Sequence, residues 1–368
     1  MSVADHTVPE HLEQTAAAFR VGEQVYASEN SLLYSALARQ GANDVPILEL
    51  ASHGMASAPP VHLFTSVHFM LLGGVEDPLA QYFPTLAERP LPPEEAYTDF
   101  RRFCLEHHDD LLELLETRTV QMTYVERCRN MVAPMTWVAD RAGEPLNVIE
   151  LGCSAGVLLT FDRYAYELRD GERVGAADAP FLLKGEVVGG PELRIPRIGQ
   201  RTGIDLNIID TQSEEDRRWM LATCFPELLG HQKRLARAMD IVAETDITWM
   251  EGDALLHLPA ALAATPDPVC VYHSACLFYW PAEAQSALDQ VLCEASRSRT
   301  IYRFGIEPSK QHTQLMAGGK DSGVEWHDDD GRAAASGEVR ITVYADGQAD
   351  ERVAAISSAT LGKTWWLD

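Results

Sequence analysis

One ten-residue stretch, Asn147–Gly156, limits the possible folds more than any other part of this 368-residue chain. It begins with an apolar run that ends in an acidic residue, continues with Gly-Cys-Ser-Ala-Gly, and leads into apolar residues at helical spacing. This order is typical of a buried parallel strand, a tight glycine turn and the start of a helix. Gly152 allows the turn, and Gly156 allows backbone to approach a ligand or a helix closely. The stretch therefore predicts an α/β sheet with a ligand site at a strand end.

Two other motifs share letters with this stretch. The dinucleotide-binding pattern Gly-x-Gly-x-x-Gly fails, because Cys153 and Ser154 break its spacing. The hydrolase pattern Gly-x-Ser-x-Gly matches, with Ser154 as its candidate nucleophile. The acidic residue just before the first glycine, Glu150, favours a nucleoside, because its carboxylate can accept a hydrogen bond from a ribose or an amine. A hydrolase elbow and a purely structural turn stay open as alternatives.

The balance of charge limits the partners. The chain has 30 basic and 55 acidic residues and a formal net charge of −25. A surface this acidic repels phosphate backbones and anionic membranes, so nucleic acid is not an expected partner. No apolar run is long enough to span a bilayer, and the first residues lack the pattern of a signal peptide, so we expect a cytoplasmic protein without a membrane partner. Seven cysteines without a Cys-x-x-Cys pair favour reduced thiols. The sequence leaves a homodimer open.

Helical spacing dominates the first part of the chain, with proline-rich breaks. The expected helices there include Ala16–Phe19, Leu32–Leu37, Val61–Leu72, Asp99–Leu115 and Val120–Val138. Beyond Asn147, strands and helices alternate, which predicts a parallel sheet with helices on both faces. We therefore predict an all-helical lid domain over residues 1–142 and a doubly wound α/β domain over residues 143–368.

The elements of the second domain follow from the same patterns. A helix at Ala155–Leu168 is expected directly after the first strand, Asn147–Leu151. Further strands are expected at Ile247–Met250, Val269–Ser274 and Thr300–Phe304, and further helices at Ser213–Cys224, His231–Ala243 and Ala282–Ala295. The second strand of the sheet is either 182–188 or 202–206, because a long insertion separates them. A last antiparallel pair is expected from Val339–Ala345 and Thr364–Leu367.

Three acidic residues stand where successive strands should end: Glu150, Asp205 and Asp253. In a doubly wound sheet, ligands bind outside the carboxyl ends of the strands, so these side chains should converge on one crevice. Each carboxylate alone could equally cap the following helix. Three of them in this order, each after an apolar strand, favour a shared ligand.

This layout resembles the S-adenosylmethionine site of class I methyltransferases. By that resemblance, Gly152, Ser154 and Gly156 approach the amino-acid part of the cofactor, and Asp205 accepts both ribose hydroxyls. The resemblance also implies that Asp253 accepts from the adenine amino group. The further positions assigned to the cofactor are Glu150, Cys153, Leu206, Ala254 and Ser274.

The wider pattern resembles a bacterial family catalogued as a domain of unknown function, with a methyltransferase-like core behind a helical N-terminal region. The resemblance covers most of the chain and is carried by Ser31–Tyr34, Tyr82–Pro84, Thr119–Gln121, Asp162–Tyr164, Asp205–Asn207, Arg234–Leu235 and Tyr272–Ser274. The chain departs from the family's pattern at Met122–Glu126, Cys153 and Leu158, which indicates a changed substrate pocket.

Candidate catalytic groups follow the fourth expected strand. Tyr272 and His273 lie where class I enzymes face the transferred group, and His273 could act as a general base near neutral pH. A histidine that is merely hydrogen-bonded within the sheet is the alternative. Tyr124, a third catalytic candidate, is expected on a helix that lines the cleft from the lid side. Glu307, after the fifth strand, could reach the pocket.

The remaining candidates concern the substrate and metals. Gln121, Arg163 and Tyr164 are expected to contact the substrate, with Arg163 binding a carboxylate through its two-pronged guanidinium. An internal ion pair is the alternative for Arg163. The runs His107–Asp110 and His327–Asp330 are interpreted as solvated patches, because consecutive helix positions do not face one site. We expect no metal.

The expected function is transfer of a methyl group from S-adenosylmethionine to a small molecule, because a helical lid suits an enclosed pocket. One alternative is intramolecular displacement within S-adenosylmethionine, which releases 5′-methylthioadenosine. Another is a nucleoside-binding protein without catalysis.

Overall fold

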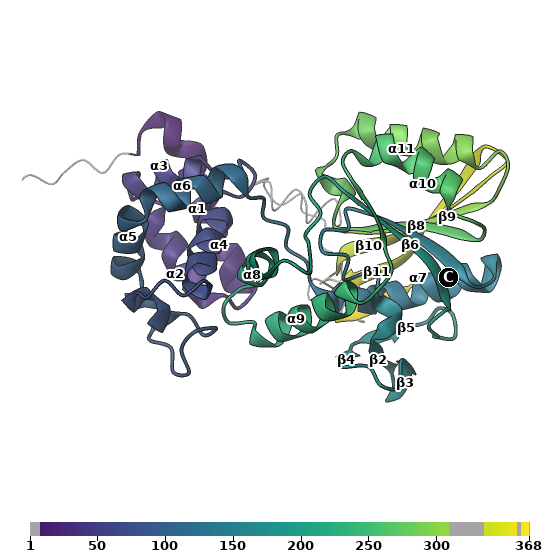
Figure 1. Ribbon diagram of the computed structural model, residues 1–368, viewed down its shortest axis with the longest axis horizontal. Helices are drawn as coiled ribbons and strands as arrows, with labels where there is room; N and C mark the ends of the chain where they lie inside the picture. Colours follow the sequence, from purple (N-terminus) through teal and green to yellow (C-terminus); the bar gives the residue numbers. More distant parts are fainter. Residues whose placement is uncertain (1–7, 309–334, 359–361, 368) are drawn as a thin grey trace, which may run out of the picture. The chain divides into compact units, whose positions relative to one another are not determined.

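The computed structural model describes residues 8–308, 335–358 and 362–367 (Figure 1). The described residues form two compact units. One is helical and contains the chain up to Thr123 together with Gln212–Ala236. The other contains a large sheet and consists of Tyr124–Thr211 and the chain from Arg237 onwards. Among the described helices, none combines the length and the apolar character needed to cross a bilayer.

The helical unit is built around α4, Pro59–Leu72, which is buried on nearly every side. An apolar surface all round is what a helix enclosed by other helices requires. The other helices of this unit are α1 (Glu13–Ser28), α2 (Leu32–Gly41), α3 (Val45–Ser52), α5 (Tyr97–Glu106), α6 (His108–Thr117) and α8 (Glu214–Ala222). The expected helix Asp99–Leu115 is divided into α5 and α6 at His107.

Two helices explain why the compact units differ from the predicted boundary between residues 142 and 143. α8 joins the helical unit because the buried Trp219 packs against His62 and Phe69 of α4 and donates from Nε1 to the Thr119 carbonyl oxygen at 3.0 Å. α7 (Cys128–Ala142) joins the sheet unit because it packs on β9 and β10. α9 (Leu229–Ala243) runs from one unit into the other.

The large sheet has the strand order β5-β12-β11-β10-β9-β8-β1-β6-β7. Its parallel part contains β9 (Ile301–Pro308), β8 (Val269–Ser274), β1 (Leu146–Leu151), β6 (Ile198–Asp205) and β7 (Thr248–Glu251). Antiparallel pairing continues it through β10 (Ala335–Ala345), β11 (Gln348–Ser358) and β12 (Lys363–Trp366), and β5 (Glu186–Val188) is the edge strand. A second, small sheet contains β3 (Glu172–Gly175), β2 (Ala165–Arg169) and β4 (Leu182–Lys184).

Helices cover both faces of the parallel strands (Figure 1). α10 (Ala254–Ala264) and α11 (Ala282–Ala295) bury Ile149, Ile204 and Val271 on one face, and α7 lies on the other. The predicted doubly wound α/β fold is therefore confirmed. The second strand is β6, which contains 202–205 and pairs with β1, whereas 182–188 divides into β4 and β5.

The predicted helix at Ala155–Leu168 is wrong. All of this segment is described, and it consists of turns, a 3₁₀ turn at Phe161–Arg163 and the strand β2. Two long-range contacts hold it: the Tyr164 hydroxyl donates to the Val157 carbonyl oxygen at 2.8 Å, and Arg201 of β6 binds both carboxylate oxygens of Asp162 at 3.0 and 2.9 Å. The apolar spacing that suggested a helix thus reflects a loop packed into the core.

Two further expectations are wrong. The helix expected at Val120–Val138 begins only at Cys128. The two expected last strands do not pair with each other, because β11 lies between β10 and β12. The segment His327–Asp330 lies outside the described residues.

The buried histidines of α4 make the helical unit sensitive to mild acid. Burial lowers the pKa of His68 from 6.5 to about 4, partly offset by its hydrogen bond to the Ala222 carbonyl oxygen. Because the unfolded chain binds the proton first, the stability contributed by neutral His68 is present above pH 6.5 and is lost as the pH falls toward 4. Between pH 7.5 and 5.5 the loss is about 1 kcal/mol.

Hydrogen exchange of the α4 segment in urea should therefore show a lower unfolding midpoint at pH 5.5 than at pH 7.5. His68→Gln should reduce this dependence, and the rest comes from His62, whose pKa burial also lowers to about 4. His108→Gln, at an exposed position, should keep the full dependence. An equal pH dependence in wild type and His68→Gln would contradict this origin of the acid sensitivity.

Candidate functional site

The loop after β1 has an unusual backbone. Gly152, Ser154 and Gly156 all have positive φ, of 73°, 49° and 68°. Glycine adopts this region without strain, but a serine there needs support from its surroundings. At Gly156 there is a second requirement, because a Cβ atom would meet the ring of Trp249 on β7. The loop is therefore fixed in a shape that turns its backbone amides toward the ends of the neighbouring strands.

Asp205, the last residue of β6, holds this loop. Its Oδ2 accepts the Ser154 amide at 2.7 Å, and its Oδ1 accepts the Asn207 amide at 3.0 Å. β1 and β6 are parallel and in register up to the pair Leu151 and Ile204, so the carboxylate lies directly beside the loop. Two sequence-predicted cofactor positions, Ser154 and Asp205, are thus brought together.

The next strand places Asp253 at the same edge. The Gly252 amide donates to the Asp205 carbonyl oxygen at 2.8 Å, and Asp253 follows it at the start of α10. The Asp253 side chain is exposed and accepts the Leu255 amide at 2.8 Å, so it caps the helix that Ala254 begins. Beside Asp205, which is 8 % exposed, the Leu206 side chain is 77 % exposed. An apolar surface next to a carboxylate suits an adenine ring next to a ribose.

Glu150 and Tyr272 lie inside the protein instead of at its surface. The Glu150 side chain is 1 % exposed and accepts the Tyr272 hydroxyl at 3.2 Å, and the Tyr272 ring stacks on Phe304. Burial raises the pKa of Glu150, while the Tyr272 hydrogen bond and the charge of Arg127 oppose the rise. Strand alternation turns both side chains onto the face that α7 covers, so neither is placed to contact a ligand directly.

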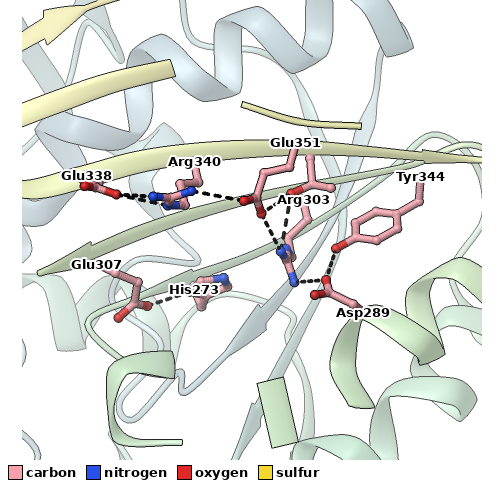
Figure 2. Close-up of polar contacts among 9 residues, drawn as sticks. His273, Asp289, Arg303, Glu307, Glu338, Arg340, Tyr344 and Glu351 are labelled. Carbon is pink, nitrogen blue, oxygen red and sulfur yellow. Dashed lines mark hydrogen bonds and ion pairs between the residues drawn. The ribbon is translucent and has the colours of Figure 1, made fainter. Parts of the chain in front are cut away.

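His273 and Glu307 form a hydrogen-bonded pair at the ends of β8 and β9 (Figure 2). His273 Nδ1 lies 2.6 Å from Glu307 Oε1. Glu307 also accepts the backbone amides of Cys276, Leu277 and Phe278, at 3.1 to 3.3 Å. Burial alone would raise the pKa of Glu307, but the hydrogen bonds from His273 and these amides outweigh it and lower the pKa.

An ionised Glu307 can only accept, so the Nδ1 atom of His273 carries the hydrogen. Nε2 then has the free lone pair that a general base needs, and no described residue is its hydrogen-bond partner. The ring lies over the α-carbon of Gly305 on β9, where a Cβ atom would collide with it. The predicted base is thus held in one orientation by its carboxylate partner and by a glycine on the next strand.

Ser274, which ends β8, has a buried hydroxyl without a hydrogen-bond partner in the described structure. Its carbonyl oxygen lies 3.5 Å from Nη1 of Arg127. Arg127 did not stand out in the sequence, because nothing around it marks a strand end. Tyr124 lies just before it, ahead of a 3₁₀ turn, and its ring centroid is 5.9 Å from Arg127 Cζ. The helix predicted around Tyr124 is absent from this described segment.

Four other predicted residues have settings of their own. Tyr164 is fully buried, and its hydroxyl braces the loop through the Val157 carbonyl oxygen. The Arg163 side chain is largely exposed and lies 3.9 Å from Asp162. Cys153 is buried, and burial raises the pKa of its thiol, which disfavours a thiolate. Gln121 belongs to the helical unit and lies outside α-helix.

Two other features bear on ligand and metal binding. An open hollow lined by Asp162, Gly175, Arg194 and Arg197 lies at the amino end of the sheet, because the Leu146 amide at the start of β1 donates to the Arg197 carbonyl oxygen. It is therefore separate from the carboxyl edge. Among the described residues, no three His, Cys, Asp or Glu side chains are grouped to hold a metal ion.

Two solved structures are described among those similar to this chain. The methyltransferase domain of bacterial CtHen1-CN is 16 % identical over 51 % of this chain and 67 % of its own, with a TM-score of 0.27. A Listeria monocytogenes protein provisionally assigned to the class I S-adenosylmethionine-dependent methyltransferases is 12 % identical over 74 % of this chain and 76 % of its own, also with a TM-score of 0.27.

A search of curated proteins finds no match. One family profile matches residues 16–360, which is nearly the whole chain. The chain therefore belongs to the family described as "Uncharacterized protein conserved in bacteria (DUF2332)".

Proposed function

We propose that this protein binds S-adenosylmethionine at the carboxyl ends of β1, β6 and β7 and transfers its methyl group to a small molecule. The observation that carries the proposal is the positive-φ loop after β1, fixed by the Asp205 carboxylate at the edge where doubly wound sheets bind ligands. A loop held before the ligand arrives loses little entropy when the ligand binds.

The described residues fit the three parts of this cofactor. The loop between Gly152 and Gly156 lies at its amino-acid end, and Asp205 accepts the ribose hydroxyls. The Ser154 and Asn207 amides hold the Asp205 carboxylate at this edge, at 2.7 and 3.0 Å. Leu206 provides an apolar contact for adenine, and Asp253 accepts its amino group beside Ala254.

When bound, S-adenosylmethionine supplies a methyl carbon that is electrophilic because it is attached to a sulfonium. The chain's own residues must align an acceptor with that carbon and exclude water. His273, held by Glu307, takes the proton that the acceptor loses as its bond to the methyl carbon forms. Glu150 and Tyr272 act indirectly in this proposal, by fixing β1 against β8 beneath the site.

Asp205→Asn tests the nucleoside site. Calorimetric titration with S-adenosylhomocysteine should show binding to wild type that is at least about tenfold weaker in Asp205→Asn, since hydrogen bonds to a charged group are lost. Glu283→Gln, which removes an exposed acid at the start of α11, serves as the matched control and should bind like wild type. Absence of binding to the wild-type protein would remove the proposal.

Asp253→Ser separates helix capping from ligand contact. Serine keeps an N-cap oxygen for the Leu255 amide but is too short to reach an adenine amino group. We expect thermal stability close to wild type and weaker binding of S-adenosylhomocysteine by about threefold to tenfold, the value of one hydrogen bond at an exposed position. Unchanged affinity would show that Asp253 only caps α10.

Long-range ¹⁵N–¹H correlation spectra test the state of His273. At pH 7.5 the wild-type imidazole should be the tautomer with hydrogen on Nδ1, because Glu307 is ionised and accepts from it. Glu307→Gln should remove this preference, while exposed histidines such as His108 keep their spectra. A wild-type His273 with hydrogen on Nε2 would contradict its role as a base.

A further inference from the structure

Arg127 places a guanidinium at the carboxyl ends of β8 and β9 within the sheet unit. It ends the 3₁₀ turn Val125–Arg127, and its side chain is partly buried. Its contact to the Ser274 carbonyl oxygen is long, at 3.5 Å, and the Tyr124 ring lies beside it.

The two most buried arginines of this unit are paired with carboxylates. Arg201 binds Asp162 through two nitrogens, and Arg303 binds Asp289 and Glu351 (Figure 2). Arg127 makes no such ion pair with any described residue. A guanidinium has five N–H donors, and burying them without acceptors is costly. Burial accordingly lowers the pKa of Arg127, although nearby acidic groups oppose the effect.

The nearby carboxylates are already engaged. Glu307 is saturated by His273 and three backbone amides, and Glu150 is enclosed with the Tyr272 hydroxyl. Close by, the buried Ser274 hydroxyl has no partner among the described residues. The strand ends therefore carry more donors, a planar fork together with a hydroxyl, than described acceptors, and an acceptor on a ligand would satisfy them.

We propose that Arg127 binds a carboxylate of a bound ligand. A carboxylate matches the fork in shape and accepts two parallel hydrogen bonds. A phosphate is disfavoured, because its second negative charge would lie near Glu150 and Glu307. The inference rests on the proposed function, because Arg127 would act in the same S-adenosylmethionine site. The carboxylate comes either from the amino-acid end of the cofactor or from the methyl acceptor.

The experiment compares Arg127→Gln with wild type, using Arg127→Lys as the variant that keeps the charge but not the fork. Arg141→Gln, an exposed arginine at the end of α7, is the matched control. Calorimetry measures the affinity of each protein for two nucleosides. S-adenosylhomocysteine has the carboxylate, whereas 5′-methylthioadenosine lacks the amino-acid end. Saturation-transfer NMR measures the binding of sodium benzoate to each protein, with and without S-adenosylhomocysteine. Thermal melting of the ligand-free proteins is the readout for a purely structural role.

If the cofactor supplies the carboxylate, Arg127→Gln binds S-adenosylhomocysteine about 10- to 100-fold more weakly and 5′-methylthioadenosine as wild type does. If the acceptor supplies it, both nucleosides bind as in wild type, and the benzoate signal of wild type is lost in Arg127→Gln. In either case the ligand-free variant melts no lower than wild type, because the lost charge had no ion pair.

Nucleoside and benzoate binding that are both unchanged in Arg127→Gln would overturn the inference. A lower melting temperature that Arg127→Lys restores, with unchanged ligand preference, would do the same. Failure of wild type to bind either nucleoside contradicts the proposed function alone. The benzoate titration without nucleoside then tests whether Arg127 binds a carboxylate. Absence of a benzoate signal from the wild-type protein would contradict that role of Arg127.

Discussion

The burial of β1 between β6 and β8 is the constraint on which the rest of the sheet unit depends. All six side chains of β1 are buried, and a shift of its register by one residue would exchange the faces of every one of them. With the register fixed, Leu151, Ile204 and His273 lie level across three parallel strands. The loops that follow must therefore emerge at one edge, where Asp205 meets Ser154 and Glu307 meets His273.

The carboxylates of this edge have a structural task before any ligand arrives. Asp205 holds the loop after β1, Asp253 caps α10, and Glu307 gathers three amides of the loop after β8. Buried or partly buried carboxylates keep their charge only where such donors compensate the loss of water. The same contacts make the edge rigid, which is the property that a site for aligning two reactants needs.

Most strands of the parallel sheet were predictable because they are apolar runs bounded by turn residues, as at β1 and β8. The wrong helix at Ala155–Leu168 had a different cause: its apolar residues do face the core, but from a loop shaped by a positive φ at Ser154 and by the distant Arg201. Tyr272 was assigned to the site by its position in the chain, whereas strand alternation places it with Glu150 beneath the site. Arg127 could not be found from the sequence, because its lack of a carboxylate partner is a property of the folded protein.

A crystal structure of the protein with S-adenosylhomocysteine tests the central claim most directly. The account predicts both ribose hydroxyls within hydrogen-bond distance of the Asp205 carboxylate, adenine against Leu206, and the loop after β1 with the positive φ angles that it has without ligand. A nucleoside bound anywhere else on the chain, or electron density at Asp205 that stays unchanged at saturating ligand, would contradict it.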